Sequence, residues 1–277
     1  MLRACTVDSV PAMQLQDATV LLTGASGGIG RAIARALDAR RAKVLMSARR
    51  EDVLEEIRVE LGGRPDALPA DLSDRAGPAA LAEQAGEVDV LVANAALPAS
   101  GRAERFSAEE IDAALDVNLR APIQLTRALL PGMLERGRGH LLYVSSLSGK
   151  VASPRGALYS ATKFGLRGYA AGLRQDVEPR GVGVTVVYPG FISEAGMFAD
   201  SGAKLPPWVG TRTPQQVAEA AVAAIENERA EVDVAPLSLR AGSIVASLAP
   251  VTVARIQRRL GSVGVAESIA QGQRPEA

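Results

Sequence analysis

The chain has 277 residues, 47% of them hydrophobic, and its 31 basic residues balance 31 acidic ones. This length can bury a large core in one domain, and zero net charge without a long basic block argues against a nucleic-acid surface. Cys5 is the only cysteine, which excludes an internal disulfide and leads us to expect a cytoplasmic location.

The N-terminal segment carries no apolar run of signal-peptide length, and Met13 directly precedes the first apolar stretch. We therefore expect residues 1–12 to be a disordered tail. Residues 13–277 are expected to form a single domain.

A glycine-rich turn follows the first strand-like run, near 18–23, and leads directly into an amphipathic helix, RAIARALDAR. Glycines in such a turn let the backbone approach a pyrophosphate, while the helix N-terminus offers free N–H groups and a positive dipole end. A plain turn is the alternative. If the turn binds a dinucleotide, the residues expected at the ligand are Gly24, Ser26, Gly28, Ile29 and Gly30.

The second strand-like run, near 43–48, ends without the carboxylate that would bind a ribose diol and repel a 2′-phosphate. Arg49 and Arg50 stand there instead, and a guanidinium fork matches a phosphate group. The sequence therefore predicts that NADP(H) is preferred over NAD(H). In the alternative interpretation both arginines are solvated or pair with Glu51 and Asp52.

His140, the only histidine, stands at the start of a strand predicted near 139–145, after strands near 66–70 and 88–93. One histidine excludes a metal site built on several. Ser146 lies at the opposite end of that strand, roughly 20 Å away in an extended chain, which argues against Ser-His-Asp hydrolysis. We predict a structural role for His140.

Tyr159 and Lys163 are four residues apart in a segment rich in Ala and Leu, so both side chains leave the same face of a predicted helix. An ammonium about 4 Å from the phenol would lower its pKa by roughly 3 units. The Ser146 hydroxyl could face a developing alkoxide. Together they favour hydride transfer at a carbonyl, although such Tyr-Lys pairs are also common on helix surfaces.

The segment 191–212, which follows a strand near 183–188, is long and glycine-rich, as is typical of a mobile lid. Its apolar side chains indicate a hydrophobic ketone, aldehyde or alcohol as substrate. They are Phe191, Met197, Phe198, Leu205 and Trp208.

After a last strand near 231–235, the pattern predicts two amphipathic helices near 237–260, too short and too interrupted to span a membrane. They could cover a substrate pocket, pack against another subunit, or rest on a membrane surface with the help of Arg255, Arg258 and Arg259. We favour packing against protein.

Strands alternate with helical patterns along the whole chain. This order predicts a Rossmann-type, doubly wound parallel α/β sheet of about seven strands with helices on both faces. Ligands in such folds bind beyond the carboxyl ends of the strands, where the motifs described above would meet.

From Thr19 to Asp233 the chain resembles the short-chain dehydrogenase/reductase family, whose TGxxxGxG pattern matches Thr23 to Gly30. The resemblance implies catalytic roles for Asn118, Ser146, Tyr159 and Lys163. In that family the tyrosine exchanges a proton with the substrate oxygen, the serine hydrogen-bonds this oxygen, the lysine lowers the tyrosine pKa and holds the nicotinamide ribose, and the asparagine positions a water.

Further cofactor contacts follow from the same resemblance. Asp71 and Leu72 would contact the adenine, although Asp71 could instead cap a helix. The other implied contacts are Asn94 and Ala95 after the fourth strand, and Pro189, Gly190 and Ile192 after the sixth.

We therefore expect an NADP(H)-dependent oxidoreductase, either a homodimer or a homotetramer, acting on a small carbonyl or alcohol. A non-catalytic NADP(H)-sensing protein and an enoyl reductase or epimerase of the same family are the alternatives.

Overall fold

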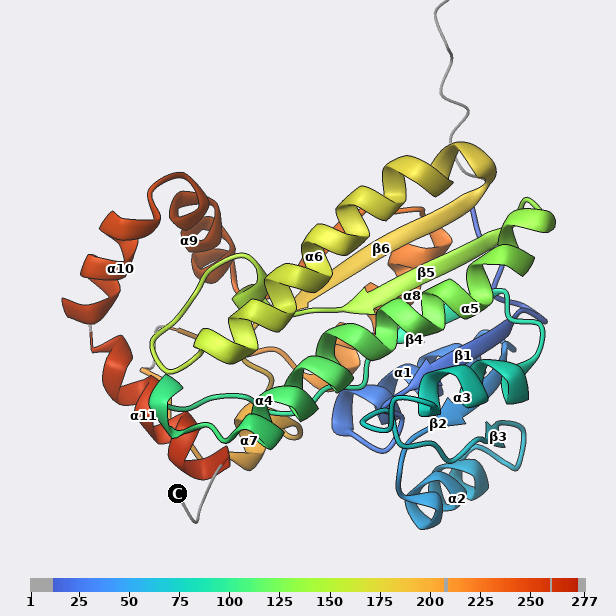
Figure 1. Ribbon diagram of the computed structural model, residues 1–277, viewed down its shortest axis with the longest axis horizontal. Helices are drawn as coiled ribbons and strands as arrows, with labels where there is room; N and C mark the ends of the chain where they lie inside the picture. Colours follow the sequence, from blue (N-terminus) through green and yellow to red (C-terminus); the bar gives the residue numbers. More distant parts are fainter. Residues whose placement is uncertain (1–11, 207–208, 260, 274–277) are drawn as a thin grey trace, which may run out of the picture.

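The computed structural model describes residues 12–206, 209–259 and 261–273. Its centre is a seven-stranded, entirely parallel sheet in the order β3-β2-β1-β4-β5-β6-β7 (Figure 1). This confirms the predicted fold class and all seven predicted strands. The strands are β1 (Thr19–Thr23), β2 (Lys43–Ser47), β3 (Asp66–Ala67), β4 (Val90–Ala93), β5 (Gly139–Val144), β6 (Val182–Pro189) and β7 (Glu231–Val234).

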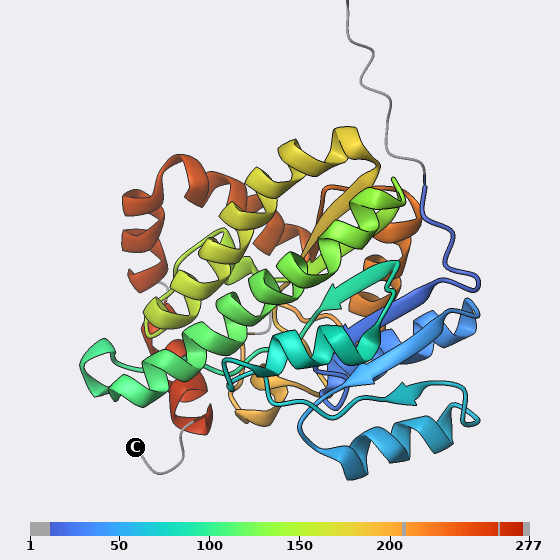
Figure 2. The ribbon, with the colours of Figure 1, turned by 45° about the vertical axis from the view of Figure 1, so that its right-hand side comes forward.

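Helices cover both faces of the sheet and enclose two hydrophobic cores (Figures 1 and 2). The central strands read as continuous apolar runs because both of their faces are buried, and β6 is buried at every residue. One core lies under α1 (Gly28–Ala39), α2 (Glu51–Glu60) and α8 (Pro214–Glu226). The other lies under α3 (Gly77–Ala85), α5 (Ala121–Glu135) and α6 (Ala157–Val177).

The helix before β5 is continuous but not uniform. Between α4 (Ala108–Leu115) and α5, residues Asp116–Arg120 form a π-helical turn, η2. Such turns occur mostly as single insertions in α-helices, frequently at functional sites. The turn carries Asn118. The 3₁₀ turns are η1 (Ala103–Arg105), η3 (Leu147–Gly149) and η4 (Glu178–Arg180).

His140 is fully buried at the start of β5. Its Nε2 lies 2.9 Å from Thr185 Oγ1 and its Nδ1 lies 3.2 Å from Glu228 Oε1. The ring therefore joins β5 to β6 and to the end of α8, at the opposite end of the strand from Ser146. The predicted structural role is confirmed.

The C-terminal helices gather beyond the carboxyl edge of the sheet (red in Figure 1). The two helices predicted near 237–260 are α9 (Leu237–Leu248) and α10 (Pro250–Arg259), and the described part of the chain has one more helix after them, α11 (Ser262–Gln273), which was not predicted. Gly261, with φ +83°, permits the turn that starts α11, and α11 packs on the short helix α7 (Met197–Asp200). In the described part of the chain no helix is long and apolar enough to cross a membrane.

Candidate active site

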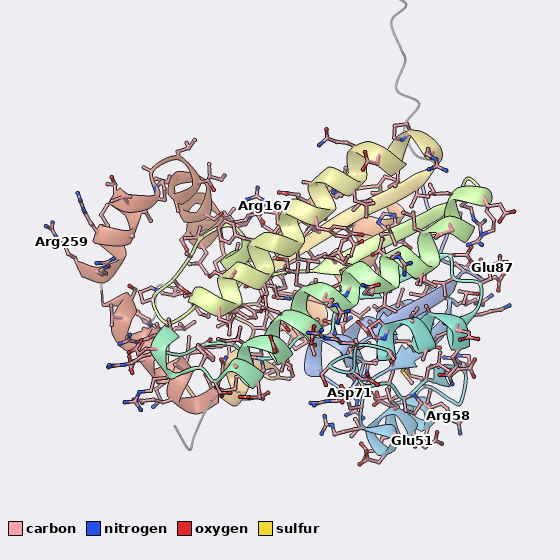
Figure 3. All side chains as sticks on the ribbon, in the orientation of Figure 1. Glu51, Arg58, Asp71, Glu87, Arg167 and Arg259 are labelled. Atoms are coloured by element: carbon pink, nitrogen blue, oxygen red, sulfur yellow. The ribbon has the colours of Figure 1, made fainter. Side chains whose placement is uncertain are left out.

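A cavity of about 780 Å³ opens at the carboxyl edge of the sheet. Loops after β1, β2, β4, β5 and β6 line its walls, and α9 and α11 close its outer side. Side chains occupy the space between the helices and the sheet (Figure 3). Parallel strands bring the ends of these loops to one place, as the fold predicts.

The glycine loop is tied to the end of β4. Asn94 Nδ2 donates to the carbonyls of Thr23 and Gly24, both at 3.1 Å, and Thr23 Oγ1 accepts from the amides of Asn94 and Ala95. A Cβ on Gly24, where φ is +67°, would lie 2.7 Å from Ala95 Cα. Glycine is therefore required there by both conformation and space.

Every residue predicted for the glycine loop lines the cavity: Gly24, Ser26, Gly28, Ile29 and Gly30. Gly28 begins α1, so the helix N-terminus faces the same space. This arrangement of free N–H groups and a positive dipole end is an anion site.

The two arginines after β2 occupy different positions. Arg49 lines the cavity, whereas Arg50 does not, and its guanidinium donates to the Ser26 carbonyl at 3.4 Å. Neither pairs with Glu51 or Asp52 in the part of the chain that the structure describes.

Asp71 and Leu72 line the cavity next to Arg49. The Asp71 carboxylate accepts from Ser73 N at 2.9 Å and from Ser73 Oγ at 2.7 Å, and these bonds lower the pKa of Asp71. The helix-capping alternative for Asp71 is wrong, because α3 begins only at Gly77. The carboxylate stays charged and closes a local turn instead.

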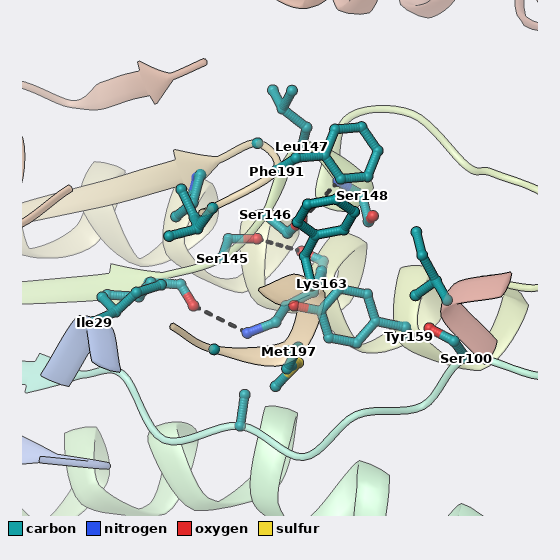
Figure 4. Close-up of a pocket in the computed structure, with 18 of the residues that line it drawn as sticks. Ile29, Ser100, Ser145, Ser146, Leu147, Ser148, Tyr159, Lys163, Phe191 and Met197 are labelled. Carbon is teal, nitrogen blue, oxygen red and sulfur yellow. Dashed lines mark hydrogen bonds between the residues drawn. The ribbon is translucent and has the colours of Figure 1, made fainter. Parts of the chain in front are cut away.

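Ser146, Tyr159 and Lys163 meet on one side of the cavity (Figure 4). Ser146 follows β5, and its Oγ accepts from Ser148 N at 3.1 Å. Lys163 is almost fully buried, donates from Nζ to the Val144 carbonyl at 3.0 Å, and lies 5.7 Å from the centre of the Tyr159 ring. Strand end and helix face converge as the sequence predicts.

The predicted effect of Lys163 on the phenol is not present in this structure. Burial raises the pKa of Tyr159 to about 12, and a hydrogen bond with Ser146 opposes the rise. Burial also lowers the pKa of Lys163 to about 8. The prediction counted the attraction of the ammonium but not the desolvation of both groups, and Nζ donates to the Val144 carbonyl. That Lys163 lowers the Tyr159 pKa when the cofactor is bound stays a prediction.

Asn118 lies behind the cavity wall, which its neighbours Val117 and Leu97 line. Its Oδ1 accepts from Leu97 N at 2.6 Å, and its Nδ2 donates to the Leu97 carbonyl at 3.0 Å. Nδ2 also lies 3.5 Å from Thr162 Oγ1, three residues from Tyr159. The π-helical turn thus fixes the loop after β4 against α6.

Pro189, Gly190 and Ile192 line the cavity beneath the lid segment, and a bridge from Ile192 to Arg212 holds both ends of that segment together. Four of the five apolar lid residues also line it: Phe191, Met197, Phe198 and Leu205. Trp208 lies outside the described residues.

Sequence reasoning missed the contribution of α11. One face of this helix lines the cavity, with the spacing i, i+3, i+4, i+7 and i+11. Glu267 on α11 pairs with Arg155, a cavity residue before α6, with 2.5 Å between Nε and Oε2. The apolar periodicity after Gly261 was the available signal. The cavity-lining residues of α11 are Ser262, Val265, Ala266, Ile269 and Gln273.

Comparison with known proteins gives one consistent result. Residues 18–206 match the short chain dehydrogenase family. The chain is 38% identical over 261 residues to the ketoacyl reductase HetN of Nostoc sp., covering 90% of this chain and 91% of that one. It is 39% identical over 186 residues to nodulation protein G of Rhizobium sp., covering 66% and 76%.

Solved structures agree. A short-chain dehydrogenase from Streptomyces avermitilis superposes with a TM-score of 0.75 at 27% identity, covering 89% of this chain and 97% of that one. The closed form of a serine dehydrogenase complexed with NADP+ gives a TM-score of 0.72 at 29% identity, with 79% and 95% covered.

Proposed function

The chain belongs to the short-chain dehydrogenase/reductase family of oxidoreductases, and from this premise we propose that it interconverts a carbonyl and an alcohol with NADP(H). The observation that carries the proposal is the meeting of Ser146, Tyr159 and Lys163 in one cavity with the glycine loop. A single domain over 13–277, a cytoplasmic location and a homodimer or homotetramer stay predictions.

The cavity fits the nicotinamide cofactor of the family. The N-terminus of α1 suits the pyrophosphate, and the cavity-lining Ser47 at the end of β2 has a buried hydroxyl with no hydrogen-bond partner among the described residues, which a cofactor substituent could satisfy. When bound, the cofactor supplies or accepts a hydride at the substrate carbon. Residues proposed to hold it are Asp71 and Leu72 at the adenine, Asn94 and Ala95 after β4, Tyr159 and Lys163 at the nicotinamide ribose, and Pro189, Gly190 and Ile192 at the nicotinamide.

The preference for NADP(H) rests on charge. Arg49 lines the cavity directly after β2 and is exposed to it, and the orphan hydroxyl of Ser47 lies two residues earlier. The neighbouring carboxylate, Asp71, is already bonded to Ser73. The charge of Arg49 helps to lower the pKa of Asp71, but among the described residues Arg49 forms no ion pair within 4 Å, which supports a phosphate rather than a ribose diol as its ligand.

In the proposed reduction, the Tyr159 hydroxyl donates its proton to the carbonyl oxygen while Ser146 Oγ donates a hydrogen bond to the same oxygen. The raised pKa keeps Tyr159 protonated at neutral pH, which is the form that this direction needs. Lys163, when charged, favours the phenolate that remains. Asn118 holds the loop after β4 in place behind them.

The apolar walls favour a hydrophobic substrate. Phe191 and Phe198 pack with 5.1 Å between ring centres and 58° between ring planes, and Leu239 and Ile269 line the cavity from α9 and α11. The name of the Nostoc relative, a ketoacyl reductase, is in keeping with a ketone on an apolar chain.

The test is turnover by the full chain with NADPH and NADH over a panel of apolar and polar ketones, aldehydes and enones. Oxidation of NADPH by apolar ketones supports the proposal. NADPH binding without turnover of any compound would favour the sensor alternative, and turnover of enones alone would favour the enoyl reductase.

A further inference from the structure

The outward faces of α9 and α10 form an apolar surface that no part of the described chain covers. On this outer surface each large apolar side chain is at least half exposed, and Leu248 is 83% exposed. Contiguous exposed apolar surface marks an interaction site. Its members are Leu237, Ile244, Val245, Leu248, Val251 and Ile256.

The two sides of helix α9 have different surroundings. Leu239, Gly242 and Ser243 recur at i, i+3 and i+4 and line the cavity. Ile244 and Leu248 recur at i and i+4 on a side that stays exposed. Covering the cavity therefore explains only the inner side of the helix.

The outer surface is also cationic. Between Asp233 and Glu267 the sequence contains four arginines and no acidic residue. All four, Arg240, Arg255, Arg258 and Arg259, are exposed, and Figure 3 shows Arg259 at the edge of the molecule, directed away from the body. On α10, Arg255 follows Val251 by one helical turn, so cation and apolar side chain share a side.

We propose that α9 and α10 dock this protein on an anionic lipid surface. Apolar side chains interleaved with arginines on helices that cannot span a bilayer are the features of an interfacial anchor. This proposal departs from the preference for a protein partner in the sequence analysis, because four exposed arginines without an intervening acidic residue complement an anionic surface. The proposal is independent of the reaction, but it would place the wall formed by α9 beside the bilayer.

The experiment is flotation of the full chain with vesicles of phosphatidylcholine alone and with about one third phosphatidylglycerol. We expect at least tenfold stronger binding to the anionic vesicles, weakened by high salt. Leu248→Asp should lower this binding by at least tenfold without changing the thermal midpoint, because the side chain is exposed. Val59→Asp, at an exposed apolar position on α2, is the matched control and should bind normally.

Charge is tested separately. The triple variant Arg255→Gln, Arg258→Gln and Arg259→Gln should bind roughly a hundredfold more weakly, since each arginine near an anionic surface contributes about fivefold. The same change at the exposed Arg127, Arg180 and Arg229, on other elements, is the control.

Three results of the flotation experiments overturn the proposal: no flotation with anionic vesicles, equal flotation with neutral ones, or equal losses in the control variants. A fall in molar mass by light scattering in Leu248→Asp, with no vesicle binding by the parent, would assign the outer surface to a contact between copies and also overturn it.

Discussion

Arg155, which lines the cavity, forms an ion pair with Glu267, although 112 residues separate them in the sequence. Arg155 belongs to the loop before α6, and its carbonyl accepts from Gly101 N at 2.7 Å. Glu267 belongs to α11, so the pair fastens the last helix to the loop that carries the catalytic side of the cavity.

Glu267→Gln should loosen α11 and raise KM for an apolar substrate by about fivefold, because a partly exposed pair contributes up to about 1 kcal/mol. The turnover number should change little, since the pair touches no reacting group. Steady-state kinetics checks this, with Glu56→Gln on α2 as control. An unchanged KM would show that the ion pair does not hold α11 in its position at the cavity.

Tyr159→Phe should lower kcat by about a hundredfold or more, the usual contribution of a positioned proton donor. Removing one hydroxyl should leave the affinity for NADPH within about twofold of the parent, because ring packing and Lys163 persist. Turnover and fluorescence titration of NADPH measure the two effects. Wild-type turnover in this variant would remove Tyr159 from the mechanism.

Lys163 is predicted to reduce stability at neutral pH. Its pKa is about 8 in the folded chain against an ordinary 10.5, so the unfolded chain binds more protons between these values and stability rises with pH through that window. The free energy of unfolding of Lys163→Met at pH 7 should therefore exceed that of the parent by roughly 1–3 kcal/mol. The gain is reduced because the Val144 carbonyl loses its hydrogen bond to Nζ.

The measurement is chemical denaturation at several pH values. From pH 8 to pH 10 the free energy of unfolding should rise more steeply in the parent than in Lys163→Met, because methionine has no group that titrates in this window. Parallel curves would mean that Lys163 titrates outside this window. Turnover should be low in the variant at every pH.

The sequence predicted the sheet well because the buried strands are short apolar runs separated by helices with one apolar face. β6, buried along its whole length, is the clearest case. The convergence of Ser146 and Tyr159 also followed, because parallel topology brings the ends of strands and the starts of helices together.

What the sequence could not provide was desolvation and long-range packing. The pKa of Tyr159 depends on how completely surrounding elements exclude water, and no local pattern contains that information. Nor does a local pattern show that Arg49 lines the cavity while Arg50 donates to the Ser26 carbonyl. Helix α11 was not predicted because its apolar spacing begins after Gly261, beyond the two helices predicted near 237–260.

Arg49 and Arg50 provide a matched pair for the cofactor prediction. Arg49→Ala should raise KM for NADPH by about tenfold or more and leave KM for NADH nearly unchanged, because only the phosphate loses its partner. Arg50→Ala should affect both cofactors little and equally. A parent enzyme that prefers NADH would contradict the predicted preference directly.

Gly28 and Ala195 test the closure of the lid segment over the glycine loop. A Cβ on Gly28 would lie 2.3 Å from Ala195 Cβ, a distance that forces the segment to move, while the backbone atoms of Ala195 stay at 3.4 Å. Gly28→Ala should therefore weaken NADPH binding and lower the thermal midpoint. Adding Ala195→Gly removes the clashing atom and should restore much of the midpoint, because no Cβ–Cβ contact remains. Ala195→Gly alone is the control. If the double variant is as unstable as Gly28→Ala, the two residues do not touch, and the lid segment lies farther from the N-terminus of α1 than in this structure.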